Sequence, residues 1–186
     1  ASELLGLHIK ANPKYGSEKK GQPTTFYATL ANEPIRLNAE LKKVDVVLSP
    51  DPNVFRHSNP IAGLSEGGVF VIQSDEDPAK VWDSFPATTQ KEIRARKLRV
   101  FILDGFKIAA AEASEAEHRY RMQGAAFMGA FFHAAPLMQR HGLDEARLFE
   151  GIEKQLAKKF GGKGGRIVED NLKIIRRGYT ELREVD

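Results

Sequence analysis

The hydrophobic pattern of the chain changes character near residue 104. Up to that point, short runs rich in Val, Ile, Leu and Phe are bounded by Gly, Pro, Asp and Asn, which is typical of strands and turns. These runs predict strands at residues 8–11, 26–30, 43–48, 69–73 and 98–103. The glycines of residues 65–68 are expected to form a turn before the fourth run. We expect the run at 98–103 to be the last strand.

Helical spacing dominates after residue 104. Apolar residues then recur every three or four positions, which predicts helices at residues 104–113, 117–140, 144–160 and 167–182. Asp104 and Asp144 are placed as N-caps and Gly142 as a C-cap glycine. Residues 161–165 are expected to connect two helices. Further helices are predicted at residues 1–7, 79–85 and 88–97, with a turn or helix start at 75–78.

Strands separated by crossovers and followed by helices indicate an α/β fold. We expect a three-layer mixed sheet with helices on both faces and a helical C-terminal portion over about residues 104–186. At 186 residues, the chain is expected to form a single domain, 1–186.

Composition excludes several classes of site. The chain has no cysteine, so it offers no disulfide, thiolate nucleophile or cysteine-ligated cluster. Its 28 basic and 25 acidic residues give a net charge of +3, and the basic residues are scattered among acidic neighbours rather than gathered in a stripe. We therefore expect no nucleic-acid partner. No apolar run is long enough to span a bilayer, so we expect no membrane contact. The absence of cysteine fits a reducing compartment, and we expect a cytoplasmic location.

The chemical motifs do not form a self-contained catalytic set. No P-loop, G-x-G-x-x-G or nucleophile elbow is present, and no histidine pair has metal-ligand spacing. His133 lies on an apolar segment and is expected to be a core or interface residue. Four aspartates lie near strand ends, where α/β sheets place ligand sites, although structural roles are favoured for them: Asp45, Asp51, Asp75 and Asp104. Two arginine pairs fit either a solvated face or a subunit contact: Arg94 with Arg96, and Arg119 with Arg121.

One loop stands out as a candidate ligand site. Lys19 and Lys20 are adjacent in a glycine-flanked segment that ends at a proline and leads directly into a predicted strand. Paired ammonium groups and free backbone N–H donors beside a sheet are suited to a phosphorylated ligand. A solvated surface turn is the alternative interpretation. The candidate site comprises Tyr15, Ser17, Lys19, Lys20, Gly21 and Gln22.

The order of these segments resembles the gamma domain of the 2-oxoacid:ferredoxin oxidoreductases, the family that includes pyruvate:ferredoxin oxidoreductase. The resemblance runs from about Lys10 to Leu182. It is carried by residues 15–21, 33–36, 44–48, 67–71, 107–109, 160–164 and 168–171.

The resemblance implies a function for the chain as part of a complex. Such enzymes oxidatively decarboxylate a 2-oxoacid, usually to an acyl-coenzyme A. Thiamine diphosphate, Mg²⁺ and iron–sulfur clusters are then expected in alpha, beta and delta-type subunits or domains, with none in this chain. Ferredoxin or another electron acceptor is expected to act through those partners. The gamma part packs on the catalytic core and helps bind coenzyme A, which we assign to Lys19 and Lys20.

Two other functions remain open from the sequence. The chain could be a structural subunit that closes the active-site cleft without touching substrate, or a stand-alone α/β nucleotide-binding protein. It could also be either a separate subunit or part of a fusion.

Overall fold

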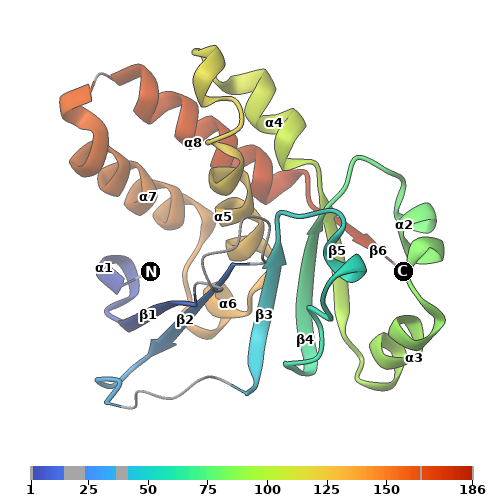
Figure 1. Ribbon diagram of the computed structural model, residues 1–186. Coiled ribbons are helices and arrows are strands. Elements are labelled where there is room, and N and C mark those ends of the chain that lie inside the picture. The colour runs from blue at the N-terminus through green and yellow to red at the C-terminus, as the bar shows by residue number, and fades with distance from the viewer. Residues whose placement is uncertain (1, 15–23, 37–41, 164, 186) are drawn as a thin grey trace. The chain divides into compact units, whose positions relative to one another are not determined.

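The computed structural model describes residues 2–14, 24–36, 42–163 and 165–185 (Figure 1). The chain forms two compact units, Ala1–Lys42 and Lys43–Asp186, and each is described by itself. The expectation of a single gamma-type domain over 1–186 stays a prediction.

The smaller unit is a short helix followed by a β-hairpin. Helix α1 (Ser2–Leu5) precedes strand β1 (His8–Lys14), which pairs antiparallel with β2 (Thr25–Ala31). The register runs from His8 opposite Ala31 to Lys14 opposite Thr25. Both strands predicted here are confirmed, and each extends a few residues beyond the predicted bounds.

The larger unit contains a four-stranded sheet in the order β3-β4-β5-β6. Strands β3 (Val44–Ser49), β4 (Leu64–Gln73) and β5 (Arg99–Leu103) are parallel to one another. Strand β6 (Arg183–Val185) adds antiparallel to β5, so the prediction that β5 is the last strand was wrong. A three-residue strand carries too little periodic pattern to be recognised alone; its pairing with β5 defines it.

Helices cover both faces of this sheet (Figure 1). Val69, Val71, Phe101 and Leu103 face a core shared with α4 (Gly105–Glu112), α5 (Gln123–Ala134) and α8 (Gly165–Thr180). The alternate residues of β4 and β5 face a second core with α2 (Pro78–Ser84) and α3 (Ala87–Ala95). Helix α7 (Glu145–Phe160) packs on α8. The three-layer α/β class is confirmed, and the near-continuous apolar strands reflect burial on both faces.

The long helix predicted over residues 117–140 is broken into three pieces. A 3₁₀ turn, η2 (Ala116–His118), precedes α5, and α6 (Leu137–Arg140) follows it. Pro136 has no backbone N–H and disfavours helical geometry in the residue before it, and Ala135 is extended at φ −74° and ψ 140°. Gly142, at φ +58°, follows α6 as the predicted C-cap glycine.

The predicted helix caps are confirmed, whereas one of the predicted turns is not. The carboxylates of Asp104 and Asp144 accept the backbone N–H groups of Lys107 and Arg147, which confirms both predicted N-caps. The turn predicted at residues 65–68 was wrong, because these residues lie within β4. Gly67, at φ +71°, lies where the β3–β4 register shifts, so its left-handed backbone serves a strand irregularity. The connector predicted at residues 161–165 contains the 3₁₀ turn η3 (Gly161–Lys163) between α7 and α8.

Candidate functional site at the carboxyl edge of the sheet

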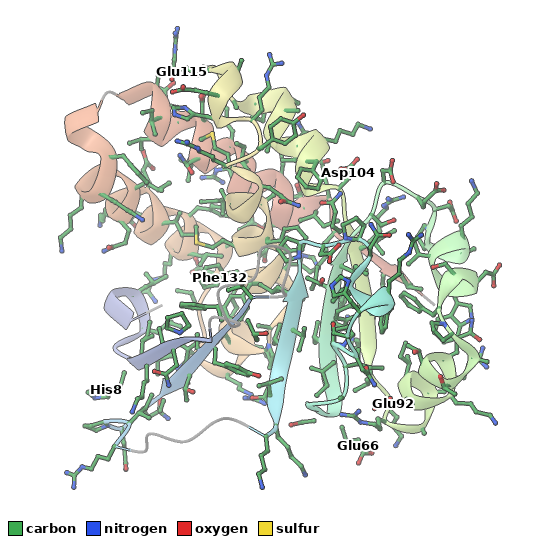
Figure 2. The ribbon with its side chains drawn as sticks, in the orientation of Figure 1. His8, Glu66, Glu92, Asp104, Glu115 and Phe132 are labelled. Carbon is green, nitrogen blue, oxygen red and sulfur yellow. The ribbon has the colours of Figure 1, made fainter. Side chains whose placement is uncertain are left out.

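The connections after β4 and β5 leave the sheet toward opposite faces. The chain leaves β4 for the face that carries α2 and α3, whereas it leaves β5 for the face that carries α4. Open α/β sheets bind ligands in the crevice that such a divergence creates outside the carboxyl ends of the strands. In Figure 2, Asp104 marks this edge of the sheet and Glu66 lies toward the opposite edge.

A cavity of about 1150 Å³ lies at this edge. It is lined by residues from the ends of β4 and β5, from the 3₁₀ turn η1 (Val54–Arg56), from α2 and α4, and from residues 116–120. All of these belong to the larger unit. The volume slightly exceeds the usual range of small-molecule sites, about 300–1,000 Å³.

Gln73 organises the floor of this crevice. The side chain is 5% exposed, and its Oε1 accepts the backbone N–H of Gly105 at 2.9 Å and the Nε2 of Gln123 at 3.2 Å. Its Nε2 donates to Oδ1 of Asp104 at 3.1 Å, and the same oxygen accepts the N–H of Lys107 at 3.0 Å. The N-terminus of α4 is therefore already supplied with an amide oxygen and a carboxylate.

Cationic side chains gather on the walls of the crevice. Arg56, Lys107 and Arg119 are exposed lining residues, and none of them forms an ion pair within the part of the chain that the structure describes. Lys80 differs, because its Nζ lies 3.3 Å from Oε2 of Glu76. Asp75 is an exposed carboxylate on the β4 side and has no ion-pair partner among the described residues.

Two exposed aromatic rings also line the crevice. Phe106 is 39% exposed and Tyr120 is 79% exposed, and both are among the large apolar side chains that stay open to solvent. Their ring centroids are 6.3 Å apart at an interplanar angle of 67°, an edge-to-face contact. Phe106 lies on α4 next to Lys107, and Tyr120 lies just after η2 next to Arg119.

The four aspartates singled out from the sequence have separate positions. Asp75 and Asp104 line the crevice. The carboxylate of Asp51 accepts the N–H of Asn53 at 2.8 Å and lies 3.1 Å from Nε2 of His57, which is a turn-stabilising arrangement. Asp45 is exposed near the start of β3. The structure thus brings together two of the four.

The remaining sequence candidates also separate. Arg119 lines the crevice and Arg121 does not, whereas Arg94 lies over the ring of Trp82 and Arg96 pairs with Glu92. His133 is exposed on α5, with its ring centroid 5.1 Å from that of Tyr179. The core alternative for this residue was therefore wrong, and the interface alternative stays a prediction.

The predicted phosphate loop is not part of the chain that the structure describes. Tyr15, Ser17, Lys19, Lys20, Gly21 and Gln22 lie outside the described residues. Sequence reasoning instead missed Gln73, Phe106 and Tyr120. The available signal for Gln73 was a lone amide at the end of an otherwise apolar strand.

One group of side chains has the composition of a metal site. Glu115, Glu117 and His118 bring ligand atoms within 4.8 Å of one another on the surface. The two imidazole nitrogens of His118 face different carboxylates, at 3.4 Å from Glu115 and 3.5 Å from Glu117. Since each nitrogen already faces an oxygen, the geometry fits ion pairs.

No helix among the described residues combines the length and apolarity needed to cross a membrane.

Comparison with known proteins defines the class of protein. The family described as pyruvate ferredoxin/flavodoxin oxidoreductase matches residues 1–181. The chain therefore belongs to this family. Its resemblance to the gamma subunit of the 2-oxoacid:ferredoxin oxidoreductases is also confirmed.

Particular relatives show this segment in two arrangements. The chain is 25% identical to the common gamma subunit of the pyruvate/ketoisovalerate oxidoreductases of Pyrococcus furiosus, over 100% of this chain and 88% of that protein. It is also 25% identical to the pyruvate-flavodoxin oxidoreductase of Trichormus variabilis, over 92% of this chain but only 14% of that protein. The same segment is thus a subunit in one relative and a small part of a longer chain in the other.

A solved structure confirms the fold. The crystal structure of the pyruvate oxidoreductase subunit PORC of Thermotoga maritima superposes with a TM-score of 0.60, covering 100% of this chain and 89% of that one at 22% identity.

Proposed function

We propose that this chain is the gamma subunit or domain of a thiamine diphosphate-dependent 2-oxoacid:acceptor oxidoreductase. The complex removes CO₂ from a 2-oxoacid, passes two electrons to an acceptor such as ferredoxin, and usually transfers the acyl group to coenzyme A. In this proposal, the chain packs on the catalytic core and helps bind coenzyme A. Thiamine diphosphate, Mg²⁺ and the iron–sulfur clusters belong to alpha, beta and delta-type partners.

The observation that carries this proposal is the match to a gamma subunit across nearly the full length of both chains. The composition supports the assignment of the iron–sulfur clusters to partner chains, because a chain without cysteine supplies no thiolate to such a cluster.

The proposed contact with coenzyme A is through Lys19 and Lys20. Their ammonium groups would act as point charges toward its phosphates, each charge-assisted hydrogen bond contributing on the order of 1.5–3 kcal/mol. Replacing both lysines with alanine in the assembled complex should raise the KM for coenzyme A by tenfold or more. Decarboxylation at the thiamine site, followed as CO₂ release with an artificial electron acceptor, should stay nearly unchanged.

A matched control is the adjacent lysine pair on α7. Lys158→Ala with Lys159→Ala removes the same charge from a different element, and we expect no change in KM. If the Lys19/Lys20 variant also leaves KM unchanged, the coenzyme A contact is wrong and the cleft-closing structural role is favoured. Native mass spectrometry of the assembly purified through this chain tests membership of the complex: partner chains and cofactors should appear, and a lone 186-residue chain would contradict it.

A further inference from the structure

We propose that the crevice at the carboxyl edge of the sheet, which is built from residues of the larger unit, is a nucleotide site. The phosphates would contact Lys107, Arg119 and Arg56, the base would stack on the Phe106–Tyr120 pair, and the ribose hydroxyls would donate to Asp75. The ligand chemistry is that of a nucleoside diphosphate, for which ADP serves as the probe. It could come from the adenylate half of coenzyme A or from a free nucleotide.

The charge distribution argues for a phosphorylated ligand. Among the lining carboxylates, Glu76 is paired with Lys80, and Asp104 is engaged by the amide of Gln73 and the N–H of Lys107. The three cations have no such partner among the described residues. They are therefore available to a ligand, and they outnumber Asp75 and Asp104, the two lining carboxylates that form no ion pair among the described residues.

The position of the acidic groups restricts where an anion can lie. The N-terminus of α4 is filled by Asp104, so a phosphate would meet a carboxylate there instead of free N–H groups. Lys107 lies in the first turn of α4, and Arg119 lies in the segment after η2. The phosphates are thus expected on the α4 side of the crevice, held by side chains rather than by the helix dipole.

The exposed rings argue for a base in addition to the phosphates. An inorganic anion would leave the rings of Phe106 and Tyr120 exposed to solvent. The flat face of a nucleotide base would instead stack on them, whichever base it is. On the opposite wall, Asp75 offers a free carboxylate. Carboxylates at this edge of α/β sheets commonly accept ribose hydroxyls.

Isothermal titration of ADP into the full chain, at low ionic strength, tests the site. We expect saturable binding that weakens by about tenfold or more in Lys107→Met and in Arg119→Gln. Two controls remove the same charges outside the crevice. Lys91→Met on α3 and Arg121→Gln, two residues beyond Arg119, should leave the affinity unchanged.

The aromatic and ribose contacts have their own variants. Tyr120→Ala should weaken ADP binding severalfold and Tyr120→Phe should not, because the stacking face is retained. Asp75→Asn should reduce the preference for ADP over its 2′,3′-dideoxy form. Circular dichroism confirms folding of each variant, and Tyr120 is exposed enough that its truncation should not unfold the chain.

Competition separates the two sources of the ligand. Displacement of ADP by coenzyme A and by 3′,5′-ADP indicates the coenzyme, and ADP binding that coenzyme A does not displace indicates a free nucleotide. No saturable binding of any of them, or binding equally tight in Lys107→Met and Arg119→Gln, overturns the inference. The Lys19/Lys20 variant should retain ADP binding, so this result is independent of the outcome for the proposed function.

Discussion

Helices α5 and α8 cross with their backbones in direct contact, at two glycines. A Cβ built on Gly178 would lie 2.0 Å from the carbonyl oxygen of Ala126, and one on Gly129 would lie 2.0 Å from that of Ile175. Ordinary contacts begin near 3.4 Å, so Gly178→Ala requires a local separation of at least roughly 1.4 Å. No side-chain rotation can provide it, because the atoms that clash belong to the backbone.

The cost of this separation follows from what surrounds the crossing. Overpacking of a core typically costs about 1–3 kcal/mol. Moving α8 also opens gaps beside Ala126, Ala130 and Ile174, each 0% exposed. Alanine restores at most about 1 kcal/mol of helix propensity. We expect Gly178→Ala to lower the free energy of unfolding by about 2–4 kcal/mol, which corresponds to a drop in Tm of roughly 5–15 °C.

Urea denaturation followed by far-ultraviolet circular dichroism measures this loss. The matched control is Gly124→Ala, near the start of α5, where an added Cβ meets nothing within 4 Å. That variant should be neutral or stabilised by up to about 1 kcal/mol. If Gly178→Ala unfolds at the same urea concentration as the parent chain with an unchanged m-value, the close crossing of α5 and α8 is wrong.

Two further predictions concern side chains that tie the C-terminal helices to the rest of the larger unit. The buried carboxylate of Asp170 accepts the N–H of Ser114 at 2.8 Å and its hydroxyl at 3.0 Å, so Asp170→Ala should cost about 2–4 kcal/mol in urea denaturation. Ser114→Ala keeps the N–H bond and should cost only about 1 kcal/mol; equal losses would contradict this ranking. Burial, and secondarily the charge of Glu145, raises the pKa of Tyr179 above its ordinary value of 10.0. The unfolded chain then loses this proton first, so stability should fall as pH rises above about 10, and less steeply in Tyr179→Phe; parallel profiles of unfolding midpoint against pH would refute this.

Local sequence signals predicted much of the larger unit. Strands β3 and β5 were located to within a residue, because each is a short β-rich apolar run bounded by turn or polar residues. The N-caps at Asp104 and Asp144 were also predicted, since a cap depends on contacts only two or three residues away.

Predictions failed where a distant partner decides the outcome. Strand β6 exists because Val185 pairs with Val100, which lies 85 residues earlier in the chain. The helix predicted at 117–140 was too long because its apolar spacing continues past Pro136, although the backbone cannot.

The lysine loop and the crevice differ in how far the sequence could predict them. The lysine loop was visible as a contiguous motif, and its role stays a prediction. The crevice was only hinted at by Asp75 and Asp104. Gln73 on its floor is held by hydrogen bonds from Gly105 and Gln123, which lie far from it in the sequence.

The sequence by itself determined the α/β class, the apolar strands and the helix caps, because these depend on periodicity and on neighbours within a turn. The tertiary structure alone decided which cations and rings share a wall of the crevice. It also decided where two helices approach closely enough to require glycine at positions 129 and 178. The shared wall follows from how the connections leave β4 and β5 for opposite faces of the sheet, and the glycines from the crossing of α5 and α8. Both are long-range properties that local pattern does not encode.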